Sequence, residues 1–145
     1  MNTLQLQRYM INDPFIRERF GGVVAIDQLP LYVEKPSVFI VNTDPISLPG
    51  KHWVVLYIDR VSEHFDSSGL QPRPRFKNYL ITTSDSYLFN SMRVQNVASK
   101  SCGLFCLFYC YFRCRDYTFK QIMEMFSENL ALNEMTVHLF YRLTV

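Results

Sequence analysis

Residues 95–105 have the sequence QNVASKSCGLF, and this stretch places a cysteine at the junction that decides the fold. A polar loop, residues 96–101, leads up to Cys102, and an apolar run, residues 104–112, follows it. Such a run is typical of a buried helix, so Cys102 is predicted to lie where a loop enters a helix. The unpaired N–H groups and the partial positive charge at a helix start favour the thiolate, which is the nucleophilic form of cysteine.

Two upstream segments carry the other side chains that a thiol hydrolase needs. His52 stands at the start of an apolar, strand-like run, and Asp66 stands at the end of a second one. Imidazole exchanges a proton near neutral pH because its ordinary pKa is about 6.5, and a carboxylate can orient it. Gln95 adds a side-chain N–H donor ahead of Cys102. These four residue types are the parts of a cysteine hydrolase.

The order and spacing of these pieces resemble those of the adenovirus-type cysteine proteases (adenain), which share a fold with the SUMO- and ubiquitin-like-protein-specific proteases. The matching pieces are, in chain order, Phe20-Gly-Gly-Val-Val24, Phe39-Ile-Val-Asn-Thr43, Gly50-Lys51-His52-Trp53, Phe65-Asp66 with Gly69, Gln95, and Cys102-Gly103-Leu104-Phe105-Cys106. The match covers residues 13–115. It implies an α+β, papain-like (adenain-like) fold in which a central, mostly antiparallel sheet packs against the helix that starts at the cysteine.

The resemblance also implies a role for each residue of the site. Cys102 is expected to attack a peptide carbonyl, with His52 as general base and later as the acid that protonates the leaving amine. Asp66 is expected to orient the imidazole. Gln95 is expected to donate an N–H to the developing oxyanion, with the backbone N–H of Cys102 as the second donor.

Substrate contacts and competing residues follow from the same segments. Trp53 and Gly103 are expected to contact the substrate, Trp53 as a wall of the site and Gly103 through the close backbone approach that it permits. Other side chains compete for the roles of base and carboxylate, namely His64, His138, Asp44 and Asp59. His52 is preferred because Trp53 follows it, as in the family.

The three remaining cysteines, Cys106, Cys110 and Cys114, follow Cys102 at intervals of four residues. Side chains at this spacing share one face of a helix. The pattern favours a stripe of small side chains in a packed helix over a disulfide or a zinc site, so no metal is expected.

Composition sets the broad class. The chain has 145 residues, 48% of them hydrophobic, which suits a single domain over residues 1–145. No run approaches the roughly 18 apolar residues of a membrane span, and the N-terminus lacks a signal-peptide pattern. We therefore expect an intracellular protein that is neither secreted nor membrane-bound, and the resemblance to the adenovirus-type proteases implies the host nucleus or the virion. The net charge of +2 is too mild to argue for nucleic-acid binding.

Local patterns predict the following elements. Helices are expected at residues 3–11, from Asp13-Pro14 to Gly21-Gly22, and at 76–83, 101–114, 119–127 and 133–143. Strands are expected at residues 37–42, 52–59, 63–66 and 87–95, with residues 23–29 as a strand or an extended loop and 43–51 as a loop.

We therefore predict a monomeric cysteine endopeptidase from a DNA virus or virus-like transposon that cleaves capsid or other structural precursors near small residues such as Gly. The alternatives are an isopeptidase that removes ubiquitin-like proteins and a catalytically silent virion or binding protein. The sequence requires no cofactor. DNA, which the family uses, and a non-covalent peptide activator remain open; the covalent activator of the adenoviral enzyme is not expected, because no Cys precedes Cys102.

Overall fold

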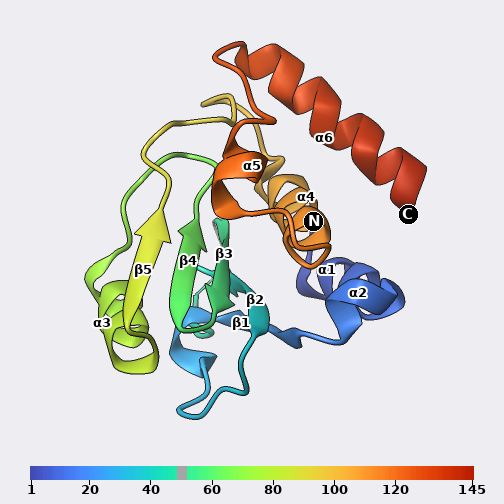
Figure 1. Ribbon diagram of the computed structural model, residues 1–145. Coiled ribbons are helices and arrows are strands. Elements are labelled where there is room, and N and C mark those ends of the chain that lie inside the picture. The colour runs from blue at the N-terminus through green and yellow to red at the C-terminus, as the bar shows by residue number, and fades with distance from the viewer. Residues whose placement is uncertain (49–51) are drawn as a thin grey trace.

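The computed structural model describes residues 1–48 and 52–145 (Figure 1). Its elements, in chain order, are α1 (Thr3–Asn12), α2 (Pro14–Arg17), β1 (Phe20–Ala25), the 3₁₀ turn η1 (Ile26–Gln28), β2 (Ser37–Asn42), β3 (Trp53–Ile58), β4 (Val61–Phe65), α3 (Pro74–Thr83), β5 (Ser86–Phe89), α4 (Cys102–Arg113), α5 (Phe119–Met123) and α6 (Leu130–Thr144).

The five strands form one sheet in the order β1-β2-β3-β4-β5. The two inner pairings, β2 with β3 and β3 with β4, are antiparallel, whereas each edge strand, β1 and β5, pairs in parallel with its neighbour. The predicted α+β fold with antiparallel strands at its centre is confirmed, and the parallel edges make the sheet a mixed one. The antiparallel β3–β4 pair matters most for the site, because it brings the start of β3 beside the end of β4.

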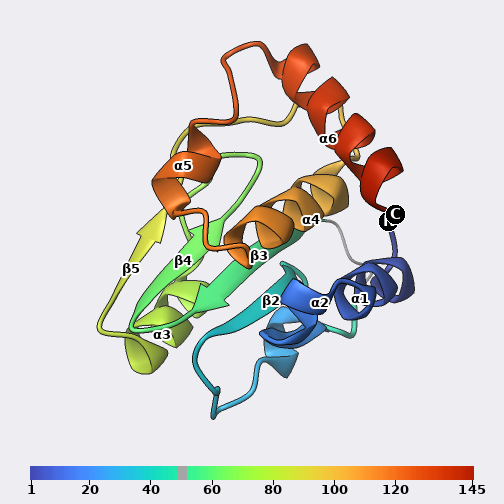
Figure 2. The same cartoon turned by 45° about the vertical axis from the view of Figure 1, so that its right-hand side comes forward.

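Helices cover both faces of the sheet (Figures 1 and 2). Alternate residues of β2 and β3 face opposite sides, as a strand requires. Val38, Ile40, Val55 and Tyr57 join the larger core with α1, α4 and α6. Their neighbours along the strands join a smaller core with α3, and these are Phe39, Val41, Val54, Leu56 and Ile58.

Helix α4 is the centre of the larger core. Its first nine residues, from Cys102 to Cys110, are all buried, as expected of a helix that is apolar on every side. An ion pair ties it to the sheet: Arg113 Nε donates to both carboxylate oxygens of Glu63 on β4, at 2.9 and 3.0 Å. Tyr109 donates its hydroxyl to the same carboxylate. The helix that begins at Cys102 is therefore fixed against the strand that precedes Asp66.

Several element ends differ from those expected. The helix α2 stops at Arg17 instead of at the glycine pair, because Gly21 and Gly22 lie in β1, where Gly21 packs directly on the ring of Phe39. The helix α5 ends at Met123, four residues early, and α6 begins at Leu130, three residues early. The helix α3 likewise begins two residues early, since Pro74 suits a first helical turn.

The strand expected at residues 87–95 ends at Phe89. Beyond it, the side chain of Asn90 replaces the backbone as the partner of β4. Asn90 Oδ1 accepts the N–H of Asp66 at 2.9 Å, and Asn90 Nδ2 donates to the carbonyl of Asp66 at 2.6 Å. The last part of the expected loop, residues 49–51, lies outside the described residues.

Candidate active site

Cys102 is the first residue of α4 and is 9% exposed. The N-cap, Ser101, makes no side-chain hydrogen bond to the first turn. The backbone N–H groups of Trp53 and Gly103 and the imidazole of His52 each act to lower the pKa of Cys102. The thiol therefore lies among donors, which is an environment that stabilises a thiolate.

His52 and Asp66 form the second part of the site. His52 immediately precedes β3 and Asp66 immediately follows β4, so the antiparallel pairing of these strands brings the two side chains together. His52 Nε2 lies 2.7 Å from Asp66 Oδ1. Cys102 also acts to raise the pKa of His52. The imidazole thus interacts with both the carboxylate and the thiol.

The pKa values of this group follow from the same contacts. Burial by itself would keep His52 neutral, but the hydrogen bonds and charges of Asp66 and Cys102 outweigh it and raise the pKa of His52 to about 9. Burial would also keep Cys102 protonated, and the donors around its sulfur outweigh it, so the pKa of Cys102 is lowered. The two shifts favour a thiolate–imidazolium pair at neutral pH.

Asp66 is held in its charged form. Burial opposes the charge, but His52 and the N–H of Ser68, which donates to Oδ1 at 2.8 Å, lower the pKa of the carboxyl. Both backbone polar groups of Asp66 are bonded to Asn90, as described above. The carboxylate therefore has a fixed position and a fixed charge.

Gln95 is 4% exposed and contacts the segment that follows β4. Its side-chain Oε1 accepts a hydrogen bond from the hydroxyl of Ser67, the residue after Asp66. Its Nε2 donates to the carbonyl of Ser99 at 3.0 Å, in the loop that leads to Cys102. Gln95 therefore joins the end of β4 to the loop before α4, and among residues 1–48 and 52–145 its second N–H on Nε2 has no hydrogen-bond partner.

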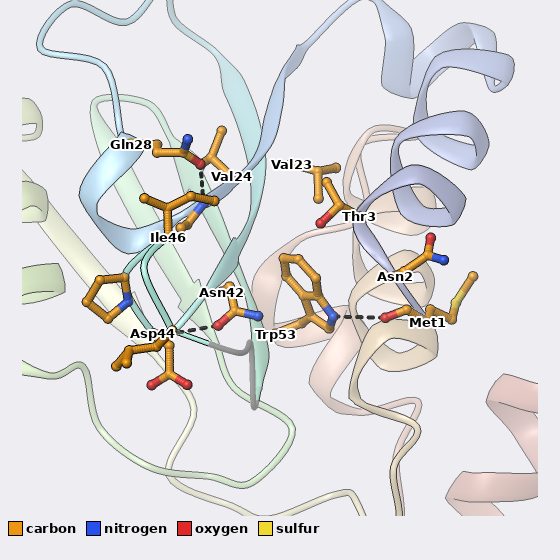
Figure 3. A pocket seen from close by; sticks show the side chains of 13 residues that line it. Met1, Asn2, Thr3, Val23, Val24, Gln28, Asn42, Asp44, Ile46 and Trp53 are labelled. Carbon is orange, nitrogen blue, oxygen red and sulfur yellow. Dashed lines mark hydrogen bonds between the residues drawn. The ribbon is translucent and has the colours of Figure 1, made fainter.

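Trp53 lines a pocket of about 340 Å³ (Figure 3). Its indole Nε1 donates to the carbonyl of Met1 at 3.2 Å, as the dashed line in Figure 3 shows. The other walls come from the start of α1, from β1, and from the loop after β2. Gly103, by contrast, is buried: a Cβ at this position would lie 3.3 Å from Met1 Cβ and 3.4 Å from Leu6 Cδ2. The absence of a side chain at Gly103 therefore allows α1 to pack closely.

The residues that compete for these roles make other contacts. His64 is 2% exposed and packs edge-on against Phe76, and burial lowers its pKa to about 4. His138 lies on α6 and contacts the Ser101 hydroxyl at 2.9 Å. Asp59 accepts the N–H of its neighbour Arg60, at the turn between β3 and β4, and Asp44 lines the pocket beside Trp53.

The other cysteines are free and buried, and burial raises the pKa of Cys106, Cys110 and Cys114. They are thiols packed in α4 at neutral pH. Within residues 1–48 and 52–145, no group of His, Cys, Asp and Glu side chains is arranged to hold a metal ion. Over the same ranges, no helix has the length and apolarity that crossing a membrane requires.

Sequence reasoning did not identify two residues that support the site, Ser67 and Asn90. Ser67 is adjacent to Asp66, but the sequence names no partner for its hydroxyl, because Gln95 is 28 residues away. Asn90 carries no sequence signal, because its partner Asp66 is 24 residues away and the contact is to backbone atoms.

Solved structures share this fold. The ASFV pS273R protease aligns with 94% of this chain and 64% of its own, at a TM-score of 0.63 and 19% identity. The SUMO protease Ulp1 aligns with 96% of this chain and 76% of its own, at a TM-score of 0.52 and 12% identity. The central domain of the uncharacterized Lpg1148 protein from Legionella pneumophila gives a TM-score of 0.56 at 12% identity, with 99% and 97% of the two chains covered. The chain therefore has the fold of the Ulp1-like cysteine proteases.

A sequence relative points in the same direction. The protease of Bovine adenovirus 7 is 29% identical over 117 residues, which cover 66% of this chain and 58% of that protein. This chain thus spans less than two thirds of the length of the adenoviral protease. No model of a protein family matches the chain.

Proposed function

We propose that this chain is a cysteine protease of the adenain type, with Cys102 as the nucleophile, His52 as the general base and acid, and Asp66 as the carboxylate that orients His52. The observation that supports this most is the 2.7 Å contact between His52 and Asp66, together with the opposite pKa shifts by which His52 and Cys102 stabilise each other's charged forms. The three side chains come from the start of β3, the end of β4 and the start of α4. The adenoviral relative is itself named a protease, and Ulp1 has a catalytic cysteine.

The chemistry follows from the protonation states. The Cys102 thiolate attacks the peptide carbonyl carbon and forms a carbon–sulfur bond, and the carbonyl oxygen becomes negatively charged. The His52 imidazolium then gives its proton to the amide nitrogen, and the carbon–nitrogen bond breaks to leave a thioester. Water attacks the thioester while His52 takes its proton. The carbon–sulfur bond breaks, and the ion pair with Cys102 is restored.

The oxyanion would lie at the start of α4. The backbone N–H of Cys102 is the first donor, and no side chain of the N-cap residue competes with it there. The free N–H on Gln95 Nε2 is the second donor. Removal of one such donor typically costs about 2.7–4 kcal/mol in barrier height. Because Gln95 is already held by Ser67 and Ser99, it loses little freedom when the oxyanion forms.

The substrate is a polypeptide, and we propose viral structural or capsid precursors cleaved near small residues. The pocket lined by Trp53, the residue after His52, is a candidate for the side chains that precede the cleaved bond. The second candidate substrate is a ubiquitin-like protein, which the shared fold with a SUMO protease favours. Both substrates use the same catalytic residues, so only cleavage itself separates them.

A peptide library that contains Gly-Gly sequences tests this proposal, in parallel with a Gly-Gly-tailed ubiquitin-like probe. We expect wild type to cleave one of the two, Cys102→Ala to cleave neither, and Cys114→Ala to match wild type. Cys114 is a matched control, since it is a buried cysteine at the far end of α4. Each reaction is run with and without DNA, so that a DNA-dependent rate would reveal a cofactor. Cleavage that persists in Cys102→Ala would refute the assignment of the nucleophile.

A further inference from the structure

We propose that Ser67 is a positioning residue that holds the side-chain amide of Gln95 in the orientation needed to bind the oxyanion. The inference rests on the proposed function, because it assigns a role to the hydrogen bond between two residues of the same site. Ser67 is 1% exposed, and its hydroxyl donates to Gln95 Oε1. No other side-chain hydrogen bond of this hydroxyl is formed among residues 1–48 and 52–145, so its whole donor capacity goes to Gln95.

The backbone of Ser67 acts on the same residue. Its carbonyl accepts the N–H of Gln95 at 3.0 Å and the N–H of Val94 at 2.9 Å. The backbone and the side chain of Gln95 are therefore both bonded to Ser67. The remaining contact of the side chain is the donation from Nε2 to the carbonyl of Ser99 at 3.0 Å.

These partners leave one orientation of the amide. The Ser99 carbonyl can only accept, so it requires the NH₂ group, and the Ser67 hydroxyl donates to the oxygen at the other end. With both ends engaged, the second N–H of Nε2 keeps a fixed direction. Without the Ser67 hydroxyl, Oε1 is left buried without a donor, and the side chain can rotate away to find one. The oxyanion would then lose a preorganised donor while the thiolate–imidazolium pair stays intact.

The arrangement also explains how one short segment can set both halves of the site. Asp66 contacts His52, whereas Ser67, in the turn that follows β4, contacts Gln95. Asn90 bonds to both backbone polar groups of Asp66 and so fixes the position of the segment. The carboxylate that orients His52 and the hydroxyl that holds Gln95 therefore belong to adjacent residues, Asp66 and Ser67.

The test is a double-mutant cycle of Ser67→Ala and Gln95→Ala, measured as kcat and KM on the substrate that wild type cleaves. We expect Ser67→Ala to lower kcat about 10-fold with KM unchanged, and to have no further effect when Gln95 is already alanine. The rate of alkylation of Cys102 by iodoacetamide should be the same in all four proteins. Ser62→Ala is the matched control, because Ser62 is a buried serine at the other end of β4, and its kcat should equal that of wild type.

One readout tests the inference apart from activity, and a second variant guards against a loss of folding. The side-chain amide resonances of Gln95, assigned with Gln95→Ala, should exchange slowly with solvent in wild type and fast in Ser67→Ala. If Ser67→Ala does not fold, Ser67→Cys, which retains a weak donor, should show an intermediate kcat.

Three outcomes overturn the inference. They are an equal loss of kcat from Ser67→Ala in both Gln95 backgrounds, a fall in the alkylation rate, and amide exchange that does not change. A wild type whose Cys102 is alkylated but which cleaves no substrate would instead refute the proposed function, and the role of Ser67 with it.

Discussion

Replacement of Asp66 by asparagine should raise the pH at which Cys102 becomes reactive. Asn keeps the shape of the side chain and removes its charge. In the wild type, the carboxylate lies 2.7 Å from His52 Nε2 and stabilises the imidazolium. The imidazolium in turn stabilises the thiolate of Cys102. Loss of the charge on residue 66 therefore weakens both members of the pair.

The size of the effect follows from the pKa of His52. Its rise from 6.5 to about 9 corresponds to about 3 kcal/mol of net stabilisation of the charged ring, achieved against burial. A neighbouring opposite charge typically contributes 1 to 3 pKa units, so the loss of Asp66 should lower the pKa of His52 by at least ~1 unit. The pKa of Cys102 should rise with it, so the thiolate fraction at neutral pH should fall.

The assay is the rate of alkylation by iodoacetamide as a function of pH, with the modified residue located by peptide mass spectrometry. Because burial raises the pKa of the other three cysteines, Cys102 should be the main product at neutral pH. Wild type should react at a constant rate from the lowered pKa of Cys102 up to about pH 9, where His52 loses its proton. The variant should react only as its thiol ionises at higher pH. Superimposable pH profiles of the two proteins would refute the reasoning.

Three further predictions concern stability. Glu63→Gln removes the carboxylate that pairs with Arg113 of α4, so it should lower the free energy of unfolding by about 3 kcal/mol. Urea denaturation measures this change, and a loss below about 1 kcal/mol would contradict the role of the pair. His64 has a folded-state pKa of about 4, so wild type should lose about 3 kcal/mol of stability between pH 7 and pH 4, as the unfolded chain takes up the proton first. His64→Leu should lose that much less over this range, and an unchanged slope would show that another group is responsible. Thr118→Ala removes the cap of α5 and should cost about 1 kcal/mol by thermal unfolding, whereas no shift in Tm would mean that the cap is not formed in solution.

Local patterns in the sequence predicted the segments that carry the chemistry. The apolar run after Cys102 is long and unbroken, so the helix α4 and its start could be predicted from residue type alone. The two strand-like runs that carry His52 and Asp66 form an antiparallel pair, because an apolar β-rich run, a short turn and a second run leave few alternatives.

The features that the sequence did not predict depend on contacts between distant residues. The end of β5 at Phe89 follows from Asn90, whose side chain bonds to the backbone of Asp66. The parallel pairing of β1 with β2, and of β5 with β4, also could not be predicted from local patterns, since a strand shows the same alternation in either direction. Gly103 was expected to face the substrate, and the structure shows in addition that α1 packs against it.

The central claim is that the Cys102 thiolate attacks the carbonyl of a polypeptide substrate. The most direct measurement is the intact mass and peptide map of the protein after reaction with a peptide that carries an electrophilic vinyl ester in place of the cleaved bond after Gly-Gly. One adduct per chain on Cys102, absent from Cys102→Ala and retained in Cys114→Ala, is the predicted result. An adduct on another cysteine, or cleavage of the parent peptide by a protein whose Cys102 stays unmodified, would contradict the account.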